Sequence, residues 1–151
     1  MAGTYELLRL AERIELLSAR LYALLAEQFR GDREASELFL RLESEEAQHA
    51  SRIRLLAARY RHDAKLLERV SVEPRFLEEL LRRGEAIVAE VAAGAWGDDL
   101  RAVKRRLGDL ELEFCHAHAH FLSEDGHPAL RAFFAQLSEQ DEAHARLLSP
   151  G

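Results

Sequence analysis

The chain has 151 residues, about the length of one domain, and 48% of them are apolar, which is enough for a hydrophobic core. A net charge of −6 argues against a nucleic-acid-binding protein held by phosphate contacts, and a single cysteine excludes an internal disulfide and a Cys-x-x-Cys site. The sequence has neither an apolar run of about 18 residues nor a basic start followed by an apolar run. We therefore expect a soluble cytoplasmic protein with no nucleic-acid or membrane partner.

Two long helices are predicted in the first part of the chain, at about residues 4–62. Apolar residues recur there at spacings of three and four, as on one face of a helix. Gly31 and Asp32 predict the turn between the helices, and the Asp32 carboxylate can cap the second helix. The second helix extends to about His62. These signals predict a helix hairpin.

A separate amphipathic helix is predicted at about residues 71–94. Pro74 suits a first helical turn, and the apolar side of this helix is marked by Phe76, Leu80, Ile87 and Val91. The stretch 94–99 contains two glycines and two aspartates, so it predicts a break in which an Asp can cap the next helix.

A second helix hairpin is predicted at about residues 98–148, with Pro128 opening its last helix. No segment has the alternation of a strand. The order of hairpin, helical connection and hairpin predicts an all-α fold, a single domain over residues 1–151. It would be a four-helix bundle of two hairpins with a long helical crossover connection.

One sequence segment is repeated, with one copy in the second helix of each predicted hairpin. Residues 39–50 read FLRLESEEAQHA and residues 134–145 read FAQLSEQDEAHA, an offset of 95. Each copy contains a carboxylate and an imidazole three residues apart, a spacing that puts both on one face of a helix. These residues are Glu46 with His49, and Asp141 with His144.

The carboxylates in both copies of the repeated segment are predicted to be buried. Glu46 and Asp141 lie on stripes that otherwise carry Phe and Leu. A charge buried alone is very costly, so each must be paired, neutralised or bound to a metal ion.

The first helix of each hairpin should supply one further carboxylate. In the first hairpin the candidates are Glu12 and Glu15, and Glu15 shares its stripe with mostly apolar neighbours. In the second hairpin they are Glu111 and Glu113, and Glu113 lies on a polar face. We therefore select Glu15 and Glu111, which are 96 residues apart (111 − 15), one off the main repeat.

The resulting set has the pattern of a two-metal carboxylate site. Four carboxylates would balance the charge of two divalent cations, and two imidazoles would complete the coordination. Mixed imidazole and carboxylate ligation suits iron better than magnesium or calcium, with manganese or a mixed pair as alternatives. The predicted ligands, which would also be the catalytic residues, are Glu15, Glu46, His49, Glu111, Asp141 and His144.

The chain resembles the ferritin-like di-iron carboxylate proteins, nearest to the rubrerythrin and bacterioferritin group. The resemblance is carried by ERIELLSARLY around Glu15, DLELEF around Glu111 and the two copies of the repeated segment. It implies a di-iron oxidoreductase of peroxidase or ferroxidase type, acting in oxidative stress or iron handling. Its small substrates would be peroxide, dioxygen or Fe(II). The resemblance also implies a homodimer.

The sequence departs from the rubrerythrin pattern at three points. Asp141 stands where the family usually has Glu, and its side chain is one methylene shorter. Gly108 and Phe114 flank Glu111 at the spacing where rubrerythrins commonly carry a second glutamate. The four-cysteine rubredoxin domain is absent, so a peroxidase would need an external electron donor.

Two other functions fit the same sequence. One is a helical interaction or scaffold protein with a relict site, whose carboxylates pair with Arg or stay protonated. The other is a di-metal hydroxylase of an organic substrate, which would need an apolar pocket beside the metals.

Some residues near the predicted site remain open to two readings. Residues two apart on a helix point in nearly opposite directions, so His116, His118 and His120 cannot form one site. His116 and His120 fit a solvated face. His118 lies on the stripe of Glu111 and could either support a ligand or simply fill the core. Tyr22 lies one heptad beyond Glu15 and could hydrogen-bond near the metals or serve as a core aromatic.

Overall fold

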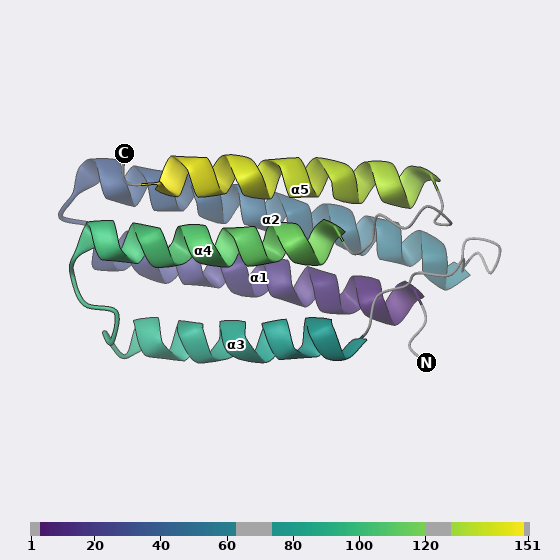
Figure 1. Ribbon diagram of the computed structural model, residues 1–151, viewed down its shortest axis with the longest axis horizontal. Coiled ribbons are helices and arrows are strands. Elements are labelled where there is room, and N and C mark those ends of the chain that lie inside the picture. The colour runs from purple at the N-terminus through teal and green to yellow at the C-terminus, as the bar shows by residue number, and fades with distance from the viewer. Residues whose placement is uncertain (1–3, 63–73, 120–127, 150–151) are drawn as a thin grey trace. The chain divides into compact units, whose positions relative to one another are not determined.

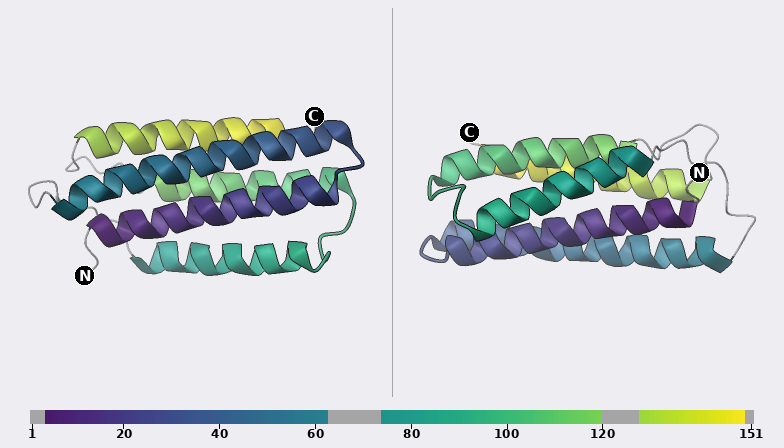
Figure 2. Two further views of the ribbon diagram at one scale, coloured as in Figure 1. Left: turned by 180° about the vertical axis from the view of Figure 1, so that it is seen from behind. Right: turned by 90° about the horizontal axis from the view of Figure 1, so that it is seen from below.

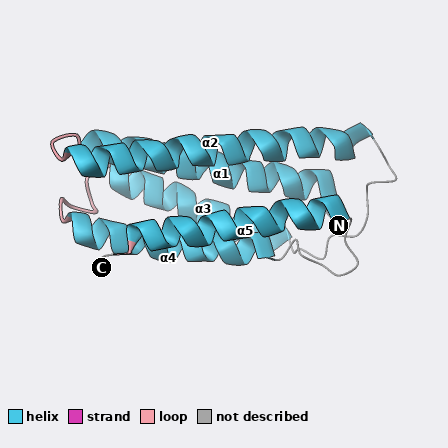
Figure 3. Ribbon diagram, turned by 90° about the horizontal axis from the view of Figure 1, so that it is seen from above, coloured by secondary structure: helices cyan, strands magenta, loops and turns pink. Residues whose placement is uncertain are grey.

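The computed structural model describes residues 4–62, 74–119 and 128–149, and within them every regular element is a helix (Figures 1 and 3). No helix in these ranges is both long enough and apolar enough to cross a membrane. The predicted all-α, ferritin-like fold class is confirmed. The helices are α1 (Thr4–Gln28), α2 (Arg33–His62), α3 (Pro74–Ala92), α4 (Leu100–Ala119) and α5 (Pro128–Leu148).

The chain divides into two compact units, described separately below. The first unit contains α1, α2 and α3. The second unit contains α4 and α5. Each unit therefore holds one of the two predicted hairpins. The prediction of a single domain over residues 1–151 stays a prediction.

In the first unit α1 and α2 form the predicted hairpin (Figure 3). Asp32 caps α2 as predicted, because its Oδ1 accepts a hydrogen bond from the Ala35 backbone N–H at 3.1 Å. The Ser36 hydroxyl then donates to the Ala26 carbonyl oxygen at 3.1 Å, which ties the start of α2 to the last turn of α1. These bonds fix the turn from which both helices run.

The third helix of the first unit, α3, packs against α1 and runs obliquely to it in the view from below (Figure 2). A β-carbon added at Gly84 would lie only 2.5 Å from Leu17 Cδ2, so the missing side chain permits this close approach. The predicted apolar side was partly wrong, because Phe76 is 37% exposed and Leu77 is buried instead. The buried stripe is centred on Gly84, which has no side chain to mark it in the sequence.

Two glycines shape the connection after α3. Gly94 has a φ of 77°, and the Ala95 N–H donates to the Glu90 carbonyl at 2.9 Å, closing the helix with a left-handed residue. Gly97 has a φ of 72°, and its carbonyl accepts a hydrogen bond from Gln28 Nε2 at 2.7 Å. The connection is thereby fastened to the end of α1.

In the second unit α4 and α5 form the other hairpin. Asp99 caps α4, since its Oδ1 accepts from the Arg101 backbone N–H at 3.1 Å, and Pro128 is the first residue of α5. Both are as predicted. His120 and most of the turn expected before Pro128 lie outside the described residues. The core residues of this hairpin include Val103, Leu107, Leu110, Phe114, Leu130, Phe134, Leu137 and Leu148.

Candidate metal centre

The six residues selected from the sequence are all buried. None of them is more than 3% exposed, a degree of burial that is rare for ionisable side chains. Among the rejected alternatives, Glu113 is half-buried, and Glu12, although 6% exposed, is bonded to Arg9 Nη1 at 2.5 Å. The predicted inward orientation of Glu15 and Glu111 is confirmed, and their role as metal ligands stays a prediction.

The first unit brings three of these residues together across its hairpin. Glu15 comes from α1, and Glu46 and His49 come from one face of α2. His49 Nδ1 lies 3.6 Å from Glu15 Oε2 and 4.0 Å from Glu46 Oε1. We call these three residues the first trio.

The second unit repeats this arrangement. Glu111 comes from α4, and Asp141 and His144 come from α5. His144 Nδ1 lies 3.6 Å from Glu111 Oε1, the same distance as in the first trio. One donor atom from each of the three residues lies within 4.8 Å of the other two. This second trio shows that the repeat in the sequence is also a repeat in space.

One histidine near the second trio has a contact that the sequence left undecided. His118 is buried on α4, and its Nδ1 is in hydrogen-bond contact with Asp141 Oδ2 on α5. It therefore supports a predicted ligand rather than only filling the core. His116, by contrast, is exposed, as predicted.

The donor atoms of the two trios fit a first-row transition metal. Each trio offers two carboxylates and one imidazole, a set that suits iron, manganese or zinc better than the all-oxygen cages that hold magnesium or calcium. No thiolate joins these donors: the Cys115 sulfur instead contacts the Ser138 hydroxyl at 3.1 Å. The residues present are therefore compatible with the implied iron.

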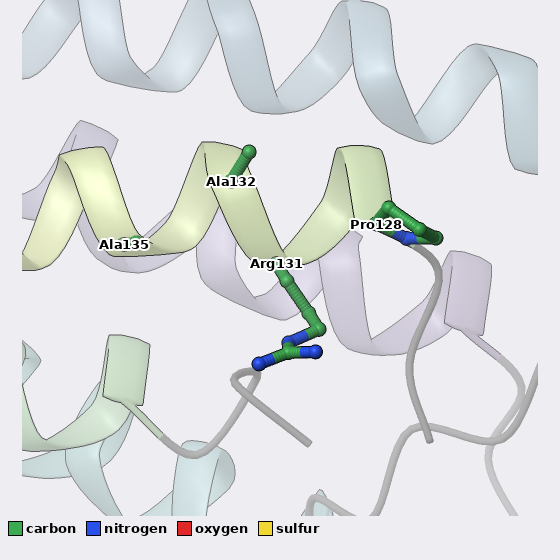
Figure 4. Close-up of a pocket in the computed structure, with 4 residues that line it drawn as sticks. All are labelled: Pro128, Arg131, Ala132 and Ala135. Atoms are coloured by element: carbon green, nitrogen blue, oxygen red, sulfur yellow. The ribbon is translucent and has the colours of Figure 1, made fainter. Parts of the chain in front are cut away.

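The hydroxylase alternative requires an apolar pocket beside the metals. A hollow of about 350 Å³ lies at the beginning of α5, where its lining consists of Pro128, Arg131, Ala132 and Ala135 (Figure 4). None of the six predicted ligands lines it, and Arg131 extends from the helix in Figure 4. This hollow does not provide the required pocket.

A comparison with family models assigns the chain to a family. The model of rubrerythrin matches residues 6–96, more than half of the 151 residues. The chain belongs to the rubrerythrin family. No curated protein and no solved structure matches the chain significantly.

The rubrerythrin match covers only part of the candidate site. It contains the first trio and extends through α3, whereas the second trio on α4 and α5 lies beyond it. Assignment of the second trio to the same kind of site therefore depends on the internal repeat and on the matching 3.6 Å distance.

Proposed function

We propose that this rubrerythrin-family chain is a di-iron oxidoreductase that reduces peroxide or dioxygen while Fe(II) is oxidised. In this proposal the six residues of the first and second trios are the ligands of two iron ions. The observation that carries it is the recurrence of the same buried trio, with the same 3.6 Å imidazole-to-carboxylate distance, in both hairpins. Two carboxylate-x-x-His helices and two Glu-bearing helices are the ligand plan of di-iron bundles.

Charge supports metal binding over a relict site. Four carboxylates placed in a core would repel one another, and burying each of them uncompensated costs several kcal/mol. Two divalent ions would supply four positive charges, so one pair of metals neutralises the whole set. The buried imidazoles add neutral nitrogen donors without adding charge.

The residues of the chain would hold and shield the iron. Each trio would bind through carboxylate oxygens and an imidazole nitrogen, and the surrounding Phe and Leu side chains would keep bulk water out. Bound iron would supply the two electrons that cleavage of an O–O bond requires. We further propose a cytoplasmic homodimer that receives electrons from a separate donor; manganese or a mixed metal pair is the alternative content.

The protein is loaded with Fe(II) under anaerobic conditions, and rapid mixing with hydrogen peroxide or with dioxygen then tests this function. The expected result is that each peroxide molecule oxidises two Fe(II), takes up two protons and yields two water molecules, without trapped hydroxyl radicals. Stopped-flow absorbance of Fe(III) and a residual-peroxide assay measure this ratio, with free Fe(II) in the same buffer as the control. A loaded protein that neither consumes peroxide nor oxidises its Fe(II) would refute the proposal.

A further inference from the structure

The two units differ at one trio position and at one position beside the trio, and in the second unit the residues at these two positions touch each other. Positions 15 and 111 correspond at an offset of 96, and the same offset relates Tyr22 on α1 to His118 on α4. At the offset of 95, Glu46 corresponds to Asp141. Where the first unit has a tyrosine and a glutamate, the second has an imidazole and an aspartate, and these two are in hydrogen-bond contact.

Each of the two rings lies against a phenylalanine at the corresponding position of the repeat. The Tyr22 ring stacks on Phe39 with centroids 6.3 Å apart, and the His118 ring lies 5.7 Å from the ring of Phe134, the repeat counterpart of Phe39. Tyr22 and His118 are both buried. Both units therefore have a ring against this phenylalanine, but the hydrogen-bonding group of the ring is a phenol in the first unit and an imidazole in the second.

A shorter carboxylate and an imidazole partner are complementary changes. Asp has one methylene less than Glu and fewer side-chain conformations, so it reaches less far from α5. His118 Nδ1 is in hydrogen-bond contact with Asp141 Oδ2. Because an ionised carboxylate oxygen only accepts, His118 fills this contact as the Nδ1–H donor and engages one of the two oxygens of Asp141. A metal bound by Asp141 would then be contacted through the other oxygen, Oδ1. A hydrogen-bonded group behind a ligand commonly sets its orientation and basicity.

We propose that His118 is a positioning residue that holds Asp141 as a ligand through a single oxygen, and that it thereby makes the metal position of the second trio different from that of the first. This inference rests on the proposed function, since it requires metal at the two trios. It predicts two unequal binding steps, of which only one depends on the His118–Asp141 pair.

A double-substitution cycle on the full chain tests the inference. The variants are His118→Tyr, Asp141→Glu and the two together, which gives the second unit the pair that the first unit carries. Calorimetry measures the affinity of each step in an anaerobic Fe(II) titration, and the absorption spectrum of bound Co(II) reports the ligand geometry. Each single substitution should weaken one binding step by about 10–100-fold, the usual effect of disturbing a group behind a ligand. The double variant should recover most of that loss.

Matched variants separate positioning from mere packing. His118→Asn keeps an N–H donor near the place of Nδ1 and should retain most of the affinity, whereas His118→Leu keeps volume without a donor and should lose it. His116→Tyr, on the exposed face of the same helix, should change neither step. Circular-dichroism melting identifies any variant that does not fold. If the double-substitution cycle is lost in this way, the metal affinities of His118→Asn and His118→Leu decide whether His118 positions Asp141.

The outcomes separate this inference from the proposed function. Failure of the unsubstituted protein to bind metal would overturn both. Two bound metals with losses that simply multiply in the double variant, or equal affinities for His118→Asn and His118→Leu, would overturn the role of His118 and leave the di-iron proposal standing.

Discussion

Replacing Glu46 with Gln is expected to lower the iron content from about two ions per chain to one or fewer and to slow peroxide consumption by more than about 100-fold. Glu46 is fully buried beside His49, so an amide of the same shape removes a charged oxygen donor without leaving a cavity. Groups that only orient a ligand typically change affinity by 10–100-fold, and loss of a ligand should exceed that. Metal analysis and a peroxide assay measure both effects.

Glu37→Gln is the matched control for this substitution. Glu37 is exposed on the same helix and pairs with Arg33 at 2.9 Å, a surface interaction worth about 0–1 kcal/mol. Its iron content and rate should equal those of the unsubstituted protein. Fewer than one metal per chain before substitution, together with unchanged melting of the Glu46→Gln variant, would favour the relict scaffold.

Chelation of the metal is expected to lower the melting temperature by about 10 °C. A ligand present at about a thousand times its dissociation constant stabilises the native state by about 4 kcal/mol, and a domain of this size gains about 2–4 °C per kcal/mol. Scanning calorimetry with and without chelator measures the difference. Restoring iron should restore the original melting temperature.

Removing the metal should reverse which protein melts higher, the Glu46→Gln variant or the unsubstituted protein. Without metal, the carboxylates of Glu15 and Glu46 remain buried beside the same His49 ring. Neutralising Glu46 relieves the repulsion between them, so the metal-free variant should melt about 2–4 °C higher, equivalent to about 1 kcal/mol. With iron present, the unsubstituted protein should melt higher. A lower melting temperature for the variant under both conditions would show that Glu46 contributes to stability rather than to metal binding.

Helix boundaries were predictable because local signals mark them. Asp32 and one aspartate of the stretch 94–99 were expected as caps, and Asp32 and Asp99 accept the backbone hydrogen bonds of caps. Pro74 and Pro128 begin their helices. The buried side of α3 was less predictable. It is set by the approach of Leu17 to Gly84, a contact between helices that no periodicity within α3 encodes.

The burial of the carboxylates was predictable from the apolar residues on the same helix faces. The hydrogen-bond contact that His118 makes with Asp141 was predictable only in part. Glu15 and Glu111 were selected because apolar residues share their faces, and both are buried. The contact of His118 with Asp141 joins two helices, so the position of His118 on α4 could suggest it but not establish it. Metal identity, the electron donor and the pairing of the two hairpins depend on groups that the pattern of one chain does not specify.

Anomalous diffraction from crystals of the metal-loaded protein tests the central claim most directly. Data collected at the iron and manganese edges identify the metal, count the ions and show their ligands. The account predicts two iron ions per chain, whose protein ligands are the residues of the first trio and the second trio. No iron at these residues, or iron held by other residues, would contradict it.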